Sequence, residues 1–300
     1  QFGPQIENLG VWNGVVITPA YTVTHDPKRM GGLPWKITFP GSGKAFQTPR
    51  WNNRLHHKEV GSFCVCDDPK ASVELIAKGP LCSVVRVRGH YVHGDKRPKS
   101  EPSAVYDWYY FRDQPLVFVT ATIQQKQSFP WNEVHFLEMD YPRGDFPRWA
   151  GGEPLQQGEF KDTKKTHSCP QWGVVHDGKA GIGMFRCGQV LFYDAGPGTY
   201  IQAHGDAAWS PWSDTRREFS AWLWLGTADD PARAVQTAAK AASTAARVLV
   251  STDSVRAKIE AAVRQIESEG PDRRAQEWWR IEGARQLEAH RGRDGRLVRA

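Results

Sequence analysis

The feature that most constrains the fold of this chain is an almost unbroken succession of strand-like segments over residues 11–225. Residues 83–92 alternate apolar and polar side chains, which is the period of two of a half-buried strand. Residues 116–123 are richer in Val, Phe and Thr and indicate a more deeply buried strand. Further strands are predicted at 131–139, 172–175, 181–185, 189–193 and 218–225. Because no helical pattern separates these segments, a parallel α/β architecture is excluded.

The pattern changes at Asp229-Asp230-Pro231, where either aspartate can cap a helix that holds the proline in its first turn. Helices are predicted at 232–250, which is rich in Ala, at 252–267, and at 273–287, which is basic. We therefore predict a mainly β fold, a large antiparallel β-sandwich (super-sandwich) with a C-terminal helical segment. The predicted domains are a β-sandwich over residues 1–228 and a helical extension over 229–300.

Tryptophan is abundant in this chain, with 13 residues against 8 Tyr and 13 Phe. An indole ring is large and amphipathic, so it suits places where an apolar face must meet a partly polar ligand. A sugar ring is such a ligand, because C–H bonds line its faces and hydroxyls line its rim. The alternative is that these rings fill the core of a wide sandwich. Taken together, the Trp residues favour carbohydrate as the ligand class.

The net charge of +6 is concentrated near the end of the chain. After Pro271 come Arg273, Arg274, Arg280, Arg285, Arg291, Arg293, Arg296 and Arg299. Such a tail suits either a nucleic-acid arm or a solvated helix face. The remainder is close to balanced and has no basic stripe interleaved with aromatics, so we predict no nucleic-acid partner. No apolar run approaches the roughly 20 residues needed to cross a bilayer, so a membrane span is excluded.

The five cysteines leave at least one thiol unpaired. Cys64-Val65-Cys66 lacks the two-residue spacer and the second pair of a zinc knuckle, and we expect its two thiols not to bond each other. One disulfide between distant strands stays open, so the cysteines do not decide the redox compartment. The chain opens at Gln1 without Met or an apolar signal core, which fits a processed secreted protein or a trimmed chain. We expect a secreted or periplasmic location.

Four stretches of the β region resemble the galactose-mutarotase-like super-sandwich superfamily. They are Ile6-Glu7-Asn8, residues 31–37 with Ser42-Gly43-Lys44, residues 79–87, and residues 176–183 with 222–226. Together they span about three-quarters of the 300 residues. This fold occurs in aldose epimerases, polysaccharide lyases and accessory domains of glycosidases. The stretches are strand-and-turn patterns rather than a catalytic signature, so the resemblance implies the fold and a carbohydrate ligand but no reaction type.

The first candidate site is the polar stretch over residues 51–58, which places many hydrogen-bonding side chains beside Trp51. In an extended chain Asn53 and His57 point to one side, whereas Arg54, His56 and Lys58 share or flank the other. Arg and Asn bind carboxylates, and a neutral His can remove a proton near neutral pH. The alternative is a solvated loop with one core-facing His.

The second candidate site lies at residues 131–138, where Glu133 and His135 share one strand face and Val134 and Phe136 the other. A carboxylate beside an imidazole can orient the ring, raise its basicity, or divide acid and base roles. The alternative is a partly buried ion pair on a sheet.

The third candidate is an aromatic face formed by Tyr106, Trp108, Tyr110 and Arg112. Such a face could stack on a sugar, with Tyr110 as the acid of an elimination. Cross-strand aromatic packing is the favoured alternative, because it stabilises sheets generally.

The fourth candidate is a long irregular loop predicted over residues 139–152, with Arg148 and Trp149 as substrate contacts. A loop over residues 204–212 has similar contents, whereas the isolated His167 and His176 are predicted to be structural. The chain has no phosphate-binding Gly loop, no Gly-x-Ser-x-Gly elbow and no His-Glu-x-x-His motif. No cofactor or metal site is predicted, although a structural divalent cation such as calcium stays open.

The leading functional hypothesis is a polysaccharide lyase that cleaves a uronate-containing glycan by β-elimination. Arg54 with Asn53 would neutralise the uronate, His57 or His135 would be the base, and Tyr110 the acid. His56, Lys58, Trp108, Arg112, Arg148 and Trp149 would bind the substrate. Two alternatives stay open: a non-catalytic carbohydrate-binding domain of a larger enzyme, and a mutarotase or glycoside hydrolase that uses the Glu133 and His135 pair. The expected partner is a polysaccharide or oligosaccharide.

Overall fold

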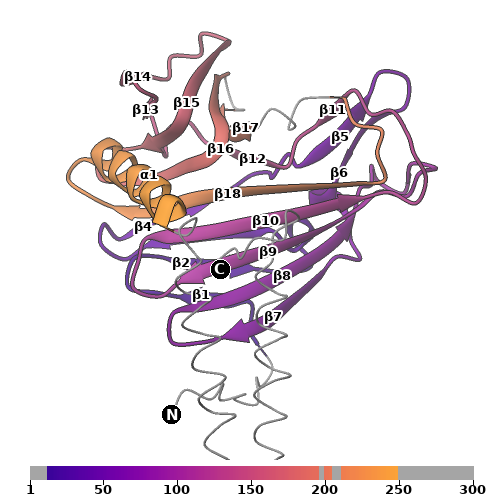
Figure 1. Ribbon diagram of the computed structural model, residues 1–300, viewed down its shortest axis with the longest axis horizontal. Coiled ribbons are helices and arrows are strands. Elements are labelled where there is room, and N and C mark those ends of the chain that lie inside the picture. Colours follow the sequence, from indigo (N-terminus) through magenta and orange to yellow (C-terminus); the bar gives the residue numbers. More distant parts are fainter. Residues whose placement is uncertain (1–11, 196–198, 205–210, 249–300) are drawn as a thin grey trace, which may run out of the picture. The chain divides into compact units, whose positions relative to one another are not determined.

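The described part of the protein is a mainly β structure with three antiparallel sheets and one helix, which confirms the predicted fold class (Figure 1). The computed structural model describes residues 12–195, 199–204 and 211–248. The predicted helices at 252–267 and 273–287 lie outside the described residues, as do the basic residues after Pro271. Among the described residues, no helix is long and apolar enough to cross a membrane.

The largest sheet has eleven strands and forms the frame of the described fold. Nine of them follow the order β14 (Gln156–Glu159), β13 (Arg148–Gly151), β15 (Lys165–His176), β16 (Ala180–Asp194), β18 (Arg216–Thr227), β10 (Leu116–Gln124), β9 (Ser103–Phe111), β8 (Cys82–His90) and β7 (Ser72–Lys78). The other two are β12 (Leu137–Tyr141) and β17 (Thr199–His204), which pair with each other, and β17 also pairs with β16.

Two smaller sheets complete the β region. The first has the order β1 (Val15–Ile17), β2 (Thr22–His25), β3 (Pro34–Phe39) and β4 (Lys44–Gln47). The second has the order β11 (Glu133–Val134), β5 (Arg54–His57) and β6 (Gly61–Cys64). Short 3₁₀ turns, η1 (Met30–Gly32) and η2 (Val65–Asp67), follow β2 and β6 respectively.

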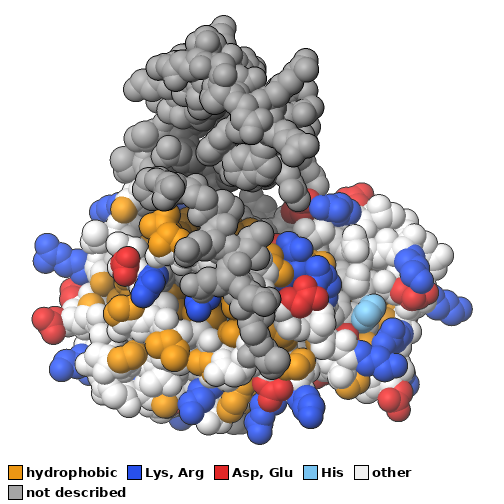
Figure 2. Space-filling model, turned by 90° about the horizontal axis from the view of Figure 1, so that it is seen from below, with side chains coloured by type: hydrophobic (Ala, Val, Ile, Leu, Met, Phe, Trp, Pro, Cys, Tyr) orange, Lys and Arg blue, Asp and Glu red, His pale blue; other side chains and the backbone are white. Residues whose placement is uncertain are grey.

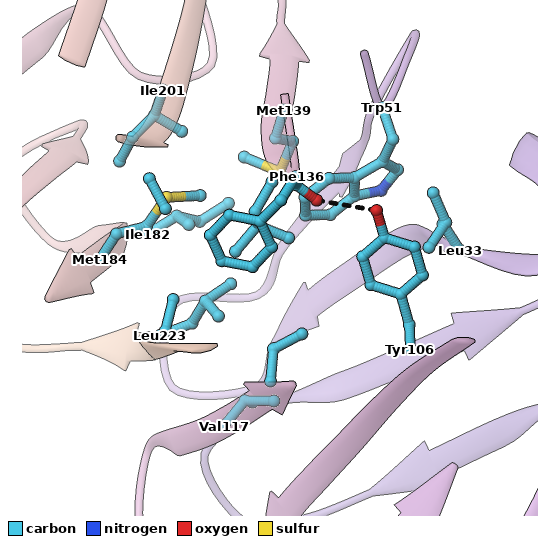
Figure 3. Close-up of a cluster of buried hydrophobic side chains, with 14 of the residues drawn as sticks. Leu33, Trp51, Tyr106, Val117, Phe136, Met139, Ile182, Met184, Ile201 and Leu223 are labelled. Carbon is cyan, nitrogen blue, oxygen red and sulfur yellow. Dashed lines mark hydrogen bonds between the residues drawn. The ribbon is translucent and has the colours of Figure 1, made fainter. Parts of the chain in front are cut away.

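The core lies between the large sheet and the four-stranded sheet. Strand β9 alternates half-buried and buried residues along its length, so every second side chain enters this core. The His25 ring of β2 packs against the Tyr110 ring of β9, with 5.7 Å between their centroids. Figure 3 shows the buried cluster, in which the Tyr106 hydroxyl donates a 2.9 Å hydrogen bond to the Phe136 carbonyl oxygen.

Two predicted strand boundaries differ from the structure. The segments predicted at 181–185 and 189–193 form one long strand, β16, which pairs with β15 on both sides of a register shift, where Arg186 and Gly188 adopt positive φ angles. The segment predicted at 131–139 is instead divided into β11 and β12. The backbone N–H of His135 between them donates to the carbonyl of Arg54 on β5, so this short stretch changes from one sheet to another.

Helix α1 (Pro231–Val248) begins where the sequence predicts it. Asp230 caps it, because its carboxylate accepts a 3.0 Å hydrogen bond from the backbone N–H of Arg233. Val235 is buried beside Gly183 of β16, and the compact unit that holds the sheets extends to Ala239. The first turns of α1 therefore pack with the sheets, and the predicted domain boundary after residue 228 stays a prediction.

The charged side chains on one face of the molecule are of mixed sign. On the visible part of this face Lys and Arg side chains are interspersed with Asp and Glu side chains and with apolar groups (Figure 2). The mixed charges do not test whether the chain binds nucleic acid, so the absence of such binding stays a prediction.

Replacement of Gly183 by Ala is expected to lower the free energy of unfolding by about 1–3 kcal/mol, as overpacking does in other cores. A Cβ atom at Gly183 would lie 2.6 Å from Val235 Cγ2, so α1 would have to move away from β16. Chemical denaturation measures the loss. Gly144→Ala is the control, because a Cβ there meets no atom within 4 Å, and a similar loss in it would contradict the explanation.

Candidate functional site

The first two candidate stretches are brought together by the three-stranded sheet. Strand β11 pairs with β5, which places Glu133 opposite His56 and Val134 opposite Leu55. Backbone hydrogen bonds extend the pairing on both sides, from the N–H of Asn132 to the His56 carbonyl and from that of His135 to the Arg54 carbonyl. Side chains that are far apart in the sequence thus form one cluster. Arg54 and Glu133, for example, are 79 residues apart.

The centre of this cluster is the imidazole of His135, which lies between two carboxylates. Its Nδ1 atom is 2.6 Å from Glu138 Oε2, and its Nε2 atom is 3.3 Å from Glu133 Oε2. The side chains of His135 and Glu138 are each 1% exposed, whereas that of Glu133 is 33% exposed. The three residues therefore form a chain of charged and hydrogen-bonding groups that leads from the surface to a buried carboxylate.

Further hydrogen bonds fix the position of Glu138. Its Oε1 atom accepts a hydrogen bond from the side-chain amide of Asn52. Its backbone N–H donates a 3.0 Å bond to Oδ1 of the buried Asn53. A buried carboxylate with these partners is held in one orientation, and it can in turn hold the imidazole in one orientation. Asn53, predicted to bind substrate, instead supports the backbone of the site.

Arg54 lies beside both carboxylates. Its Nη2 atom is 3.2 Å from Glu133 Oε2 and its Nη1 atom is 3.9 Å from Glu138 Oε1, with 26% of the side chain exposed. Burial acts to raise the pKa of Glu133, but the hydrogen bond and charge of Arg54 outweigh it and hold that pKa below its ordinary value. Glu133 is therefore an ionised hydrogen-bond acceptor near neutral pH.

Strands β12 and β17 add polar residues that the sequence analysis did not select. Their register places Glu138 opposite Gln202 and Asp140 opposite Tyr200. The Gln202 amide nitrogen lies 3.1 Å from His135 Nδ1. The Tyr200 ring is half-buried and stacks on Tyr193 of β16, with centroids 5.3 Å apart. The sequence could have predicted this polar face, because Glu138 and Asp140 alternate with apolar residues in the segment that forms β12.

Asp140 differs from Glu133 in its protonation. Burial first, and then the negative charge of Glu138, raise the pKa of Asp140 to about 7, although Arg50 and Arg54 act in the opposite direction. Burial and the charge of Glu138 also raise the pKa of Tyr200. The site thus combines a carboxylate that is ionised at neutral pH with a second one that is partly protonated there.

The other residues of the first stretch lie at the edge of the cluster. His56 Nδ1 is 2.9 Å from Ser62 Oγ, and Lys58 is exposed. His57 follows the buried Leu55 by two residues, so it lies on the opposite face of β5 from Arg54. Its ring packs on Phe129, with 5.1 Å between centroids. The predicted base role of His57 is therefore not supported by its position.

The prediction of a sugar-stacking face on β9 is wrong, because that face is buried in the core. Tyr106, Trp108 and Tyr110 are each at most 2% exposed, since this face of β9 packs against the four-stranded sheet. Tyr110 bonds His25 Nε2 at 2.6 Å and is not among the partners of the His135 cluster. Arg112 is exposed just beyond the end of β9. These rings are part of the core, where Trp108 and Tyr110 contact the rings of Tyr21, His25 and Trp51 rather than aromatic neighbours on the adjacent strands.

The loop predicted over residues 139–152 is shorter than expected, because β12 continues to Tyr141 and β13 begins at Arg148. The side chain of Arg148 is 52% exposed and lies 4.0 Å from Glu159. Trp149 is buried and stacks on His167 at 4.4 Å between centroids. These two residues contact β14 and β15 rather than the His135 cluster, and the loop predicted at 204–212 lies largely outside the described residues.

Comparison with known proteins gives similarity in structure only. No protein-family model and no curated protein sequence matches this chain. A galactose mutarotase related enzyme from Lactobacillus acidophilus matches with a TM-score of 0.46 and 8% identity, over 72% of this chain and 98% of that one. A putative aldose 1-epimerase from Klebsiella pneumoniae matches with a TM-score of 0.45 and 9% identity, over 73% and 80%.

An alpha-mannosidase from Enterococcus faecalis matches with a TM-score of 0.48 and 10% identity, over 73% of this chain. This chain spans 29% of the length of that mannosidase. A galactose mutarotase related enzyme is thus among the structures similar to this chain, as the resemblance of the sequence implied. At TM-scores below 0.5 these similarities assign no activity to it.

Replacement of Asp140 by Asn is expected to become increasingly favourable for stability as the pH rises from about 4 to about 7. Because the pKa of Asp140 is raised in the folded protein, the unfolded chain releases this proton at a lower pH than the folded protein does. The stability of the wild type therefore falls as the pH rises through that interval. Urea unfolding at a series of pH values measures the difference between the two proteins. Asp95→Asn, at an exposed turn, supplies the background slope, and an equal slope for both variants would contradict the assignment.

Replacement of Tyr110 by Phe is expected to lower the free energy of unfolding by about 1–3 kcal/mol, the cost of a buried unsatisfied group. Burial lowers the pKa of His25 to about 4, so its ring is neutral. Nδ1 lies 2.8 Å from the Gly32 carbonyl, so Nε2 accepts from the Tyr110 hydroxyl and would lose that partner. The control is Tyr109→Phe, at a half-exposed position, and equal losses in the two variants would refute this account.

Proposed function

We propose that this chain is a carbohydrate-active protein that transfers protons to and from a bound neutral sugar at the His135 cluster. The observation that carries the proposal is the position of His135 between the buried Glu138 and the partly exposed Glu133. This arrangement suits the mutarotase or glycosidase alternative, which uses the Glu133 and His135 pair.

The residues of the cluster can divide the work between a proton acceptor and a proton donor. Glu133 is ionised and partly exposed, so it can accept a hydrogen bond, and then a proton, from a sugar hydroxyl. His135, oriented by Glu138, lies 3.3 Å from Glu133 and can hold that carboxylate in position. Asp140, with a pKa of about 7, holds a proton part of the time near neutral pH and can donate it. Two carboxyl groups whose pKa values are shifted in opposite directions are a common basis for acid and base roles.

A half-exposed aromatic pair lies next to the charged groups. Tyr200 is opposite Asp140 in the pairing of β12 with β17, and Tyr193 stacks on it from β16. Aromatic rings beside carboxylates suit a sugar, because the rings contact C–H groups while the carboxylates bind hydroxyls. We assign the ring contact to this pair in place of the buried Tyr106, Trp108 and Tyr110.

The charge of the cluster favours a neutral sugar over a uronate. Arg54 already lies beside Glu133 and Glu138, and the nearby Arg50 forms a two-bond ion pair with Asp67. A uronate carboxylate would therefore meet repulsion from the carboxylates of the cluster rather than a free guanidinium. The lyase hypothesis also loses Tyr110 as its acid, because that side chain is buried against His25. β-Elimination stays a prediction that the assay below also tests.

Glu133→Gln is expected to lower kcat on a neutral sugar substrate by about 10²-fold or more, because the proton acceptor is removed. Substrates are screened in three groups: free neutral aldoses, with anomer exchange followed by NMR; neutral chromogenic glycosides; and uronate polymers, with formation of an unsaturated product followed by ultraviolet absorbance.

Asp140→Asn should lower kcat on the same substrate, with loss of the pH dependence that Asp140 confers.

Glu159→Gln is the matched control, since Glu159 is an exposed carboxylate on β14 that contacts Arg148 and should leave kcat unchanged. Sugar binding without turnover in any group would overturn the proton-transfer role and support the alternative of a binding domain. Unsaturated product from a uronate polymer would overturn the choice of a neutral sugar and support the lyase hypothesis. The expected secreted or periplasmic location is a separate proposal, tested by fractionation of the source cells.

A further inference from the structure

A second group of chemically reactive side chains lies at the end of β6, outside the cluster described above. Cys64 is the last residue of β6, and Cys66 and Asp67 lie in the 3₁₀ turn η2 that follows. The two sulfur atoms and a carboxylate oxygen of Asp67 all lie within 4.8 Å of one another. Both thiols are buried, at 3% and 8% exposure, whereas the Asp67 side chain is 28% exposed. Two sulfur ligands and one oxygen ligand thus lie close enough together to contact a single metal ion.

The fold creates this convergence through the turn η2. On a continued strand, residues 64 and 66 would share one face, but their side chains would be spaced along the strand. The turn instead curls the chain, as the 3.0 Å hydrogen bond from Asp68 N–H to the Val65 carbonyl shows. The β6 side is fixed by the pairing of Cys64 with Arg54 on β5 and by the bridge of Cys64 to Val92. The site is therefore built on paired strands rather than on a free loop.

We propose that Cys64, Cys66 and Asp67 form a binding site for a Zn²⁺ ion. Zinc is commonly bound by thiolate and carboxylate ligands in tetrahedral geometry. With Zn–S bonds of about 2.3 Å, two thiolates on one ion lie about 3.8 Å apart, so these side chains need only a small movement to close on it. The exposed side of Asp67 leaves the fourth position to water. No zinc knuckle is needed, because a single pair with an adjacent carboxylate supplies three ligands.

The surrounding charges support a bound dication. Two thiolates and Asp67 would bring three negative charges to the site, which Zn²⁺ and the guanidinium of Arg50 would balance. Arg50 already binds Asp67 through two hydrogen bonds, of 3.1 and 2.7 Å. Metal binding would release the protons of both thiols, because zinc binds cysteine as the thiolate.

One side chain links this site to the His135 cluster. Oδ1 of Asn52 lies 3.6 Å from the Cys64 sulfur, and its amide nitrogen donates to Glu138. In this contact the thiol donates to the amide oxygen, so loss of the thiol proton on metal binding would remove the hydrogen bond and couple the metal site to the amide that orients Glu138. The proposed zinc site does not depend on the activity of that cluster, and it can be tested without a sugar substrate.

The test is a titration of the reduced full-length chain with Zn²⁺ in competition with a chromophoric chelator. We expect one ion bound per chain, with affinity at least about tenfold lower in Cys64→Ser, in Cys66→Ser and in Asp67→Asn. Co²⁺ in place of Zn²⁺ should give a thiolate-to-metal charge-transfer band that the two Ser variants weaken. Circular dichroism establishes that each variant is folded, and Asp67→Asn keeps the test valid if a buried Ser destabilises the chain.

Cys82→Ser is the matched control, because Cys82 is a half-buried thiol on β8 and should leave the titration unchanged. The proposal is overturned if the reduced chain binds no Zn²⁺ more tightly than the Cys64→Ser, Cys66→Ser double variant. It is also overturned if Cys82→Ser removes binding to the same degree. A Co²⁺ complex without a charge-transfer band would place the ion at other ligands and overturn the assignment.

Discussion

One buried hydrogen bond connects the core of this protein to its candidate site. The Tyr106 hydroxyl, on the inner face of β9, donates to the carbonyl of Phe136. Phe136 directly follows His135, in the short segment that leaves the three-stranded sheet and enters β12. A buried phenol must satisfy its hydroxyl, so the packing of β9 also determines where this segment lies. The position of His135 is thereby set by the same strand alternation that builds the core.

Much of the fold followed from patterns within single segments. Period-two alternation predicted β8, the content of Val, Phe and Thr predicted β10, and the Asp-Asp-Pro sequence predicted the start of α1, because these signals depend on near neighbours. The division of 131–139 into β11 and β12 was missed, because its cause is the pairing of β11 with β5 far away in sequence. The continuity of β16 was missed because Arg186 and Gly188 adopt positive φ angles without ending the strand.

The candidate site was predicted in part for the same reason. Glu133 and His135 were selected because their spacing places them on one strand face, and Arg54 because of its polar neighbours. Glu138 and Tyr200 were missed, since their roles depend on the pairing of β12 with β17. Tyr110 and Trp108 were selected wrongly, because alternation shows which residues share a face of a strand but not which face is buried. The charge balance around Arg54 could not be predicted from the sequence either, because it depends on where Glu133 and Glu138 lie in the folded chain.

The separation of the site residues along the chain has a consequence for how the protein folds. Arg54 and Glu133 are 79 residues apart, and Asn53 and Glu138 are 85 residues apart. Contacts of such long range form only after the intervening strands have paired, because closing a large loop costs entropy. We therefore expect the cluster to be assembled late in folding, after the strands between its residues have paired. Any activity of this site reports complete folding of the chain, which secondary-structure spectroscopy by itself does not.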